Sequence, residues 1–395
     1  MRHTQFSVLA TLLSLTMLAG CAPSENKKGP EVFYPDPPDL ARIQYLTSFN
    51  GVKDLQKTSA FEKFIVGKEN TGTLDKPYGV AMFEGKIYVC DTNATVMVFD
   101  LKEKTFGQLQ GAQGMGKLVQ PINISLGPDG TKYVADAVRE QILVYDKNDF
   151  YVRAYSMGVP GEWRPVDAAA FEDRVYVADT QNGEIKVFDK QSGKLVKRFG
   201  KDGDPTEWLQ FPTNLAFDSS GYLYVSDTGR FQIVKYDRDG HVIGRIGEMG
   251  REAGTFSRPR GIAVDRQGRL YAVDAAFDNV QLFDKQGKLL LSFAKAGITP
   301  GDLYLPAKIA IDYGGSQYFR QYIDPNFEAE YIILVTSQFG DKKVNVYAFG
   351  QEKGKRYPTD EELQKELDDK IKKYKQEHPE KEEKKAGEET KKSAP

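Results

Sequence analysis

The chain has 395 residues, of which 40% are hydrophobic and 12% aromatic, and its 54 basic and 56 acidic side chains leave a formal net charge of −2. This composition is typical of a soluble, folded protein with a large core. The near-neutral balance, without a concentrated basic stripe, argues against nucleic acid as the main partner.

The N-terminus has the pattern of a signal peptide. An apolar stretch over Phe6–Met17 is too short to span a bilayer and leads into Leu-Ala-Gly-Cys, which ends at Cys21. We therefore predict a signal peptide over residues 1–20, with cleavage before Cys21. An ordinary secretory signal that happens to contain a cysteine is the alternative. The Pro-rich residues 21–40 are predicted to form a stiff tether.

Six prolines recur at a nearly constant spacing after the tether. They are separated by 44, 44, 47, 47 and 47 residues, and most follow a similar hexamer such as GTLDKP or GTFSRP. The six are Pro77, Pro121, Pro165, Pro212, Pro259 and Pro306. A period in the forties indicates a repeat fold.

Each repeat contains short runs of alternating apolar residues. Residues 258–294 show the pattern: the runs are rich in Val, Ile, Tyr and Phe, and Asp-Arg-Gln-Gly and Asp-Lys-Gln-Gly turns separate them. They are too short for helices. Four strands per repeat predict one blade of a β-propeller.

The ends of the repeat array predict how the ring closes. The sixth repeat ends near Gly350 without a fourth strand, whereas Ala41–Phe49 has the pattern of a fourth strand but precedes the first repeat. We therefore predict an all-β, six-bladed propeller over residues 41–350, a monomeric ring closed by this N-terminal strand, which removes an open sheet edge.

The repeat resembles the NHL repeat, on motifs such as KPYGVA with IYVCD and VMVFD. This resemblance implies a propeller but not an activity, because such propellers include protein-binding, RNA-binding and catalytic members. The N-terminus is similar to that of bacterial lipoproteins. That similarity implies a lipid-modified Cys21, bearing acyl chains such as palmitate, and Ala22 rather than Asp after it implies the outer membrane.

The residue type two positions after each proline differs between the repeats. This position lies near the predicted mouth of the central channel. Four of the six residues there are polar and form a candidate ligand site: Asn123, Asp167, Asn214 and Lys308. Their oxygens could hold Ca²⁺, as in the calcium-dependent lactonase-like propellers that the fold resembles. Against this, the set has one carboxylate and a competing lysine, and a polar, water-filled mouth is the alternative. No cofactor is predicted.

An insertion in the sixth repeat, over residues 313–331, is the second candidate site. Its aromatic residues and one arginine are of the types that protein interfaces favour. The candidate partner-binding residues are Tyr318, Phe319, Arg320, Tyr322 and Phe327. The alternative is a loop that folds back on its own blade.

Other reactive residue types are given structural roles. His241 is the one histidine in the propeller and lies in a predicted rim turn, so no catalytic or metal-binding residue is predicted. Cys90 is expected to be a small buried residue. Aspartates that end the second strands are expected to accept backbone hydrogen bonds in turns: Asp91, Asp136, Asp179, Asp227 and Asp274.

Residues 351–395 form a charged tail. Thr359 and Glu362 predict a capping box that opens a helix to about Gln376. Its apolar stripe consists of Leu363, Leu367, Ile371 and Tyr374. From His378 to Pro395 the chain has no core-forming residues and is predicted to be disordered.

Two functions are left open by the sequence. The first is a non-catalytic, lipid-anchored scaffold of the outer membrane that binds another envelope protein. Resemblance to lipoproteins that accompany multihaem cytochrome export systems makes an electron-transfer complex one candidate partner. The alternative is a hydrolase or lyase of the six-bladed propeller class that acts at the channel mouth.

Overall fold

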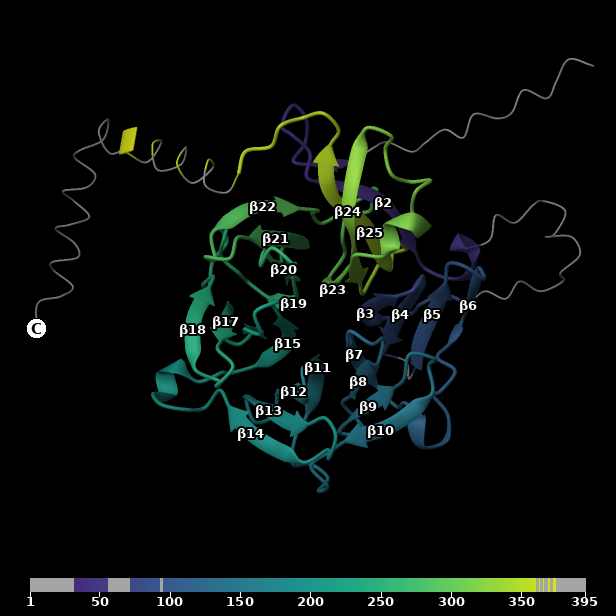
Figure 1. The fold of residues 1–395 in the computed structure, drawn as a ribbon, viewed down its shortest axis with the longest axis vertical. Coiled ribbons are helices and arrows are strands. Elements are labelled where there is room, and N and C mark those ends of the chain that lie inside the picture. The colour runs from purple at the N-terminus through teal and green to yellow at the C-terminus, as the bar shows by residue number, and fades with distance from the viewer. Residues whose placement is uncertain are drawn as a thin grey trace, which may run out of the picture. The chain divides into compact units, whose positions relative to one another are not determined.

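The computed structural model describes residues 32–55, 72–92 and 95–359, together with Glu362, Lys365, Asp369, Lys372 and Lys373. Six antiparallel sheets surround a central axis (Figure 1). The predicted six-bladed propeller is therefore confirmed. The predicted signal peptide, Cys21, and most of the tether and tail lie outside the described residues.

The first three blades have four strands each. Blade one consists of β3 (Pro77–Phe83), β4 (Lys86–Asp91), β5 (Thr95–Asp100) and β6 (Thr105–Gln108). Blade two consists of β7 (Pro121–Leu126), β8 (Lys132–Asp136), β9 (Gln141–Tyr145) and β10 (Tyr151–Tyr155). Blade three consists of β11 (Pro165–Phe171), β12 (Arg174–Asp179), β13 (Glu184–Asp189) and β14 (Leu195–Phe199).

The remaining blades follow the same order, and blade six has five strands. Blade four consists of β15 (Pro212–Phe217), β16 (Leu223–Asp227), β17 (Gln232–Tyr236) and β18 (Val242–Ile246). Blade five consists of β19 (Pro259–Val264), β20 (Leu270–Asp274), β21 (Asn279–Phe283) and β22 (Leu289–Phe293). Blade six consists of β23 (Pro306–Asp312), β24 (Phe327–Ser337), β25 (Val344–Glu352), β2 (Ile43–Phe49) and β1 (Phe33–Tyr34).

Short 3₁₀ helices occupy four connections: η1 (Val52–Asp54), η2 (Gly114–Gly116), η3 (Pro205–Glu207) and η4 (Gly315–Tyr318). The predicted capping box is present, because the Thr359 N–H donates to Glu362 Oε2 at 3.0 Å and the Glu362 N–H donates to Thr359 Oγ1 at 3.2 Å. The apolar stripe of the predicted helix lies outside the described residues.

The repeated proline and aspartate have one local explanation. In each blade the inner strand begins at the proline, where the register shifts by a bulge. In blades one to five the aspartate that ends the second strand lies opposite the proline, and in blade six Ser337 takes this place. Asp136 accepts hydrogen bonds from Val138 and Arg139 in the following turn and from Gln120 just before Pro121. The expected turn role is confirmed, and the same carboxylate also positions the start of the inner strand.

The N-terminal strand closes the ring as predicted. Strand β2 pairs with β25 from Ile43 opposite Phe349 to Phe49 opposite Val344, so purple and yellow-green strands share a sheet in Figure 1. Strand β1 then pairs with the start of β2. Two residues of the segment predicted as a tether therefore belong to the blade.

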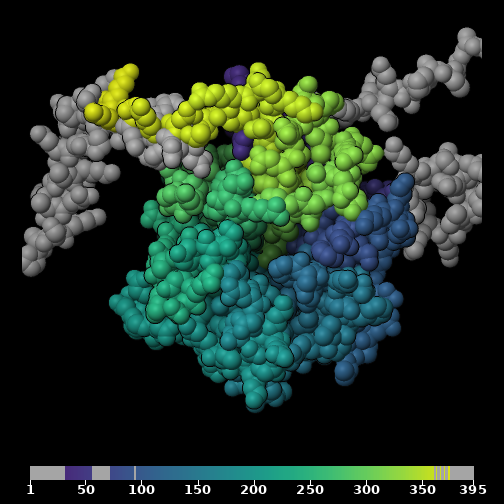
Figure 2. Space-filling view, viewed as in Figure 1, coloured from purple at the N-terminus to yellow at the C-terminus, as the bar shows by residue number. Residues whose placement is uncertain are grey.

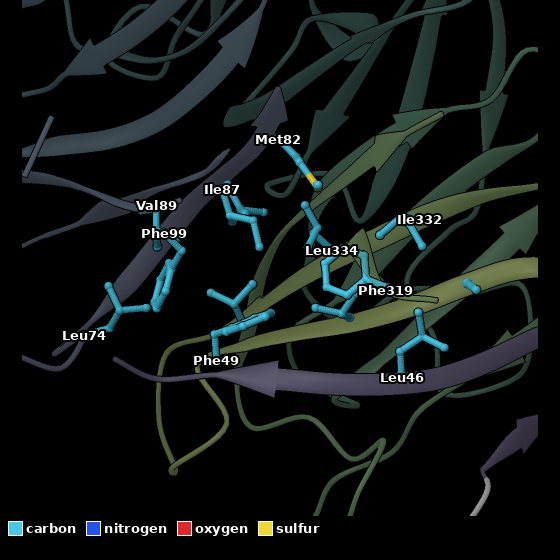
Figure 3. Close-up of a cluster of buried hydrophobic side chains, with 14 of the residues drawn as sticks. Leu46, Phe49, Leu74, Met82, Ile87, Val89, Phe99, Phe319, Ile332 and Leu334 are labelled. Atoms are coloured by element: carbon cyan, nitrogen blue, oxygen red, sulfur yellow. The ribbon is translucent and has the colours of Figure 1, made fainter. Parts of the chain in front are cut away.

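A hydrophobic cluster seals the boundary between blade six and blade one (Figure 3). Phe49 of β2 packs against Phe99 of β5, with ring centroids 5.5 Å apart, and against Phe319 of the blade-six insertion at 6.3 Å. Figure 2 shows blade six, in yellow-green, beside blade one, in blue. The closing strand is thus fixed by side-chain packing as well as by backbone pairing.

The antiparallel order of the strands gives the ring two faces. The connections between blades and the turns between second and third strands share one face with the prolines, which we call the proline face. The turns between first and second strands, including the blade-six insertion, lie on the opposite face, which we call the insertion face.

Candidate functional site

The centre of the ring contains an ion pair between opposite blades. Lys308, in β23 of blade six, places its Nζ 2.6 Å from Oδ2 of Asp167, in β11 of blade three. Both side chains are buried. Asp167 also accepts hydrogen bonds from the backbone N–H groups of Leu215 and Ala168, each at 3.0 Å. Burial raises the pKa of Asp167, and the Lys308 ammonium opposes that rise.

The two asparagines complete a polar layer around this ion pair. The Asn123 amide donates to the Val166 carbonyl at 2.9 Å, and the Asn214 amide nitrogen lies 3.5 Å from Asp167 Oδ2. With its amide oxygen and nitrogen exchanged, Asn214 would instead accept from the Asn123 amide at 3.3 Å and donate to the Arg260 carbonyl at 3.2 Å. The structure therefore brings together all four residues of the predicted channel site.

Two glycines allow the inner strands to approach closely at the same level. A Cβ on Gly79 would lie 2.6 Å from the Asn123 Cα, and a Cβ on Gly261 would lie 2.5 Å from the Lys308 Cα. No side chain could be tolerated at such distances. The expectation that the four polar residues line an open mouth is therefore wrong, because they form a buried floor below it.

This floor does not suit a calcium ion. Its one carboxylate is already neutralised by the Lys308 ammonium. Asn123 Oδ1 is buried without a hydrogen-bond partner, but this adds one oxygen where Ca²⁺ takes six to eight. Within the part of the chain that the structure describes, no group of three or more His, Cys, Asp or Glu side chains could hold a metal.

Above the floor, Arg260 and Tyr78 line the mouth on the proline face. The guanidinium carbon of Arg260 lies 5.4 Å from the centroid of the Tyr78 ring, and its Nη1 donates to Gln338 Oε1 at 3.4 Å. Burial and the neighbouring Arg258 lower the pKa of Arg260.

Exposed apolar side chains recur on the face that carries this mouth. They lie in the loops between blades and in turns between second and third strands, all on the proline face. Nine such residues are Met115, Val119, Val138, Val159, Phe211, Met249, Ile298, Tyr304 and Phe339. Among the described residues, the turns of the insertion face expose three, Phe150, Tyr222 and Tyr322, and the outer strands expose four more, Val152, Val196, Val242 and Ile243. We call the nine residues the apolar crown.

The blade-six insertion belongs mainly to the core. Phe319 and Phe327 are buried in the cluster at the closing boundary, and Tyr318 packs against it over the turn at Gly85. These three aromatics therefore follow the alternative, a loop that folds back on its own blade. Tyr322 and Arg320 are exposed, but the Tyr322 carbonyl accepts a hydrogen bond from the Gln44 side chain of β2 at 3.1 Å. The insertion thus fastens the closing strand.

The remaining sequence candidates lie away from the axis. Cys90 is fully buried, as expected, and burial raises the pKa of its thiol. His241 lies at the rim, as expected, with its Nδ1 3.1 Å from Asp237 Oδ2. It borders an open cleft of about 680 Å³ between β14 and β18, whose walls carry mixed charges from Lys197, Arg198, Arg245, Asp202 and Glu207.

No family model matches the chain. A protein of unknown function from Bacteroides thetaiotaomicron is 15% identical, with a TM-score of 0.55 over 78% of this chain and 76% of that one. A streptogramin B lyase is 12% identical, with a TM-score of 0.49 over 78% and 88%. A gluconolactonase from Xanthomonas campestris is 18% identical, with a TM-score of 0.49 over 82% and 98%. At such identities the likeness shows the propeller fold alone.

Sequence reasoning missed the apolar crown and Arg260. Crown residues lie in loops of different lengths, where no period marks them, and each looks like an isolated surface residue. Arg260 could have been found, since it stands directly after Pro259, where four of the other five repeats have an apolar or aromatic residue.

Proposed function

We propose that the protein is a non-catalytic, lipid-anchored scaffold of the outer membrane that binds another envelope protein through its proline face. The ion pair between Asp167 and Lys308 carries this proposal. The ion pair occupies the charged groups at the axis that a catalytic site there would need. It also connects opposite blades, which makes the ring rigid. The apolar crown then supplies the kind of surface that partner proteins cover.

The anchor in this proposal is Cys21. No helix among the described residues is long and apolar enough to cross a membrane. Acyl chains contribute roughly 0.8 kcal/mol per buried CH₂, so a cysteine that bears more than one chain holds a protein stably on a bilayer. An electron-transfer complex with a multihaem cytochrome is one candidate partner.

The crown can be tested with matched variants. A full chain carrying Met115→Ser, Met249→Ser, Ile298→Ser and Phe339→Ser should capture at least tenfold less of its envelope partner, because interface anchors typically contribute about 2 kcal/mol each. The control carries Phe150→Ser, Tyr222→Ser and Tyr322→Ser on the insertion face and should capture as the parent does. Equal loss in both variants would contradict the proposal.

The enzyme alternative is supported by one observation, the half-buried Arg260 beside Tyr78 in the mouth. Such a pair could orient an anionic substrate above the closed floor. Incubation of the full chain with a panel of lactones and esters that bear a carboxylate or phosphate group tests it. Turnover by the parent that Arg260→Gln abolishes would favour the hydrolase.

A further inference from the structure

We infer that the mouth on the proline face is a carboxylate-binding site, in which Arg260 receives an acidic side chain or a C-terminal carboxylate of the partner protein. This inference rests on the proposed function, because it names the chemistry at the centre of the partner-binding face. It is carried by the contacts of Arg260, the charges around the mouth and the neutral floor beneath it.

Arg260 is held in place but lacks a charged partner. Its guanidinium stacks over Tyr78 and donates one hydrogen bond, to the Gln338 amide oxygen. Across residues 95–359 and the described segments before them, no carboxylate forms an ion pair with Arg260. A guanidinium has five N–H donors arranged to hold a carboxylate in a bidentate manner. Most of these donors remain available in the mouth.

Gln338 and Tyr78 are themselves fixed, so the arginine is positioned in advance. The Gln338 backbone N–H donates to the Leu305 carbonyl at 3.2 Å, and the Gln338 carbonyl accepts from Lys343 Nζ at 2.8 Å. The Tyr78 carbonyl accepts from Thr336 Oγ1 at 2.5 Å. A pre-positioned donor loses little side-chain entropy when it binds an anion.

Basic residues predominate at the positions directly beside the inner-strand prolines, although the exposed Asp75 lies one position farther out. Lys76, Arg164 and Arg258 each stand directly before an inner-strand proline and are exposed. None of the six blades has an acidic residue directly before or after its proline, or directly after the residue that ends its second strand. The aspartates at those strand ends, such as Asp136, are engaged by backbone N–H groups.

The floor does not cancel this charge. Asp167 is the carboxylate nearest the axis in the polar layer, and Lys308 already neutralises it at 2.6 Å. The Arg260 carbonyl lies 3.2 Å from the position that the Asn214 amide nitrogen takes when its oxygen and nitrogen are exchanged, so the mouth directly adjoins the floor. An anion that enters the mouth therefore meets Arg260 above a floor of no net charge.

Charges farther out favour an acidic protein segment over an anionic lipid surface. The loops that carry the apolar crown also expose Glu162, Asp202, Asp204, Glu248 and Glu252. The same loops expose Lys117, Lys201, Arg251 and Lys295, so the outer part of the face carries mixed charge and offers no continuous positive surface to an anionic bilayer. One acidic group at the centre, with apolar contacts on the crown around it, fits both the charges and the hydrophobic pattern.

The first experiment measures partner capture by the full chain in detergent. Arg260→Gln should reduce capture at least tenfold and flatten its dependence on salt, and Arg260→Lys should retain part of the binding. Arg251→Gln, which removes an exposed arginine from the outer part of the same face, should capture as the parent does. Unchanged capture by Arg260→Gln, with loss in the crown variant, would overturn the carboxylate site and leave the scaffold intact.

The second experiment identifies the bound group. A photoreactive benzoylphenylalanine in place of Phe339, which is exposed and follows Gln338 directly, should cross-link to a partner peptide that contains Asp, Glu or a C-terminus. A peptide without a nearby carboxylate would overturn the inference. Binding of the parent to phosphatidylglycerol vesicles that is lost in Arg260→Gln, without loss of partner capture, would assign the site to lipid and also overturn it. If Arg260→Gln and the crown variant both captured the partner as the parent does, the carboxylate site and the proposed scaffold function would both be wrong.

Discussion

The Lys308 ammonium lies 2.6 Å from the Asp167 carboxylate although the two residues belong to opposite blades of the ring. Neighbouring blades contact each other through their hydrophobic faces, but this ion pair joins blades that share no face. It therefore acts as a cross-brace at the axis. Both charges are removed from water, and the attraction between them offsets the desolvation cost of burying each one.

Removing one member of this ion pair should destabilise the ring strongly. Lys308→Met leaves Asp167 buried without its counter-charge, and such a change typically costs about 3–5 kcal/mol. The double variant Lys308→Met with Asp167→Leu should recover part of the loss, because no uncompensated charge remains. Denaturant unfolding of the three proteins measures the difference. A single variant as stable as the parent would contradict the cross-brace.

The insertion should stabilise the ring through Phe319. Phe319→Ala empties a site that packs against Phe49, and large-to-small changes of a buried Phe cost about 3–5 kcal/mol. Tyr322→Ala, at an exposed position of the same insertion, is the control and should change the free energy of unfolding by about 0.5 kcal/mol or less. Similar effects of both would show that the insertion does not seal the boundary.

Ring closure should depend on β2 more than on β1. A chain that begins at Asn50 lacks both strands and should melt several degrees below the parent, since each kcal/mol shifts the Tm of a domain of 150–250 residues by about 2–4 °C and that of a larger ring by somewhat less. A chain that begins at Ala41 retains β2 and should lose much less. Calorimetry compares them, and equal melting of the Asn50 chain and the parent would refute closure by β2.

Asp149 should give the protein part of its sensitivity to acid. Its carboxylate accepts from Lys132 Nζ at 2.7 Å, Lys86 Nζ at 3.0 Å and the Tyr88 hydroxyl at 2.9 Å. Burial alone would raise the pKa of Asp149, but these hydrogen bonds outweigh it and hold the pKa below its ordinary value. The stability it contributes is therefore complete above the unfolded pKa of about 3.9 and is lost as the pH falls through the folded value.

The matching variant is Asp149→Asn, because Asn tolerates the φ of 72° at this position. The parent should be more stable than the variant near pH 7, where the variant leaves Lys132 buried without its counter-charge. The gap in free energy of unfolding should shrink on acidification below about pH 4. A gap that is constant or widens toward low pH would show that the carboxylate is not the titrating group.

Cys21 should be required for membrane attachment. Cys21→Ser is expected to give a soluble protein or one that retains its signal peptide, because no other segment approaches the roughly 20 apolar residues of a membrane span. Fractionation of cells, with carbonate washing of the membranes, measures this. A mature, unmodified protein that resists the wash would reveal a second anchor.

The fold was predictable because the six repeats can be aligned with one another within this one sequence. Six prolines at an even spacing mark the start of each blade, and Ala41–Phe49 had no other partner than the incomplete sixth repeat. The site was less predictable for the same reason. The insertion has no counterpart in the other repeats, so nothing in the pattern distinguished the buried Phe319 from the exposed Tyr322.

The channel residues show a second limit. The sequence placed Asn123, Asp167, Asn214 and Lys308 together, since they occupy equivalent positions in their repeats. How near they lie to solvent depends on how closely the inner strands approach, which Gly79 and Gly261 decide by lacking a Cβ. Sequence patterns report the side chains present and say little about such backbone distances.

The pairing of β2 with β25 has a consequence for how the chain acquires its structure. Ile43 meets a partner more than 300 positions later, at Phe349. Contacts between residues so far apart form slowly, because a long loop must close before they stabilise anything. Blades one to five can assemble from local hairpins as the chain emerges, whereas the sixth has to wait for the last residues to be made. Until then the growing protein presents an unpaired β-edge at each end, and the final step of folding removes both at once.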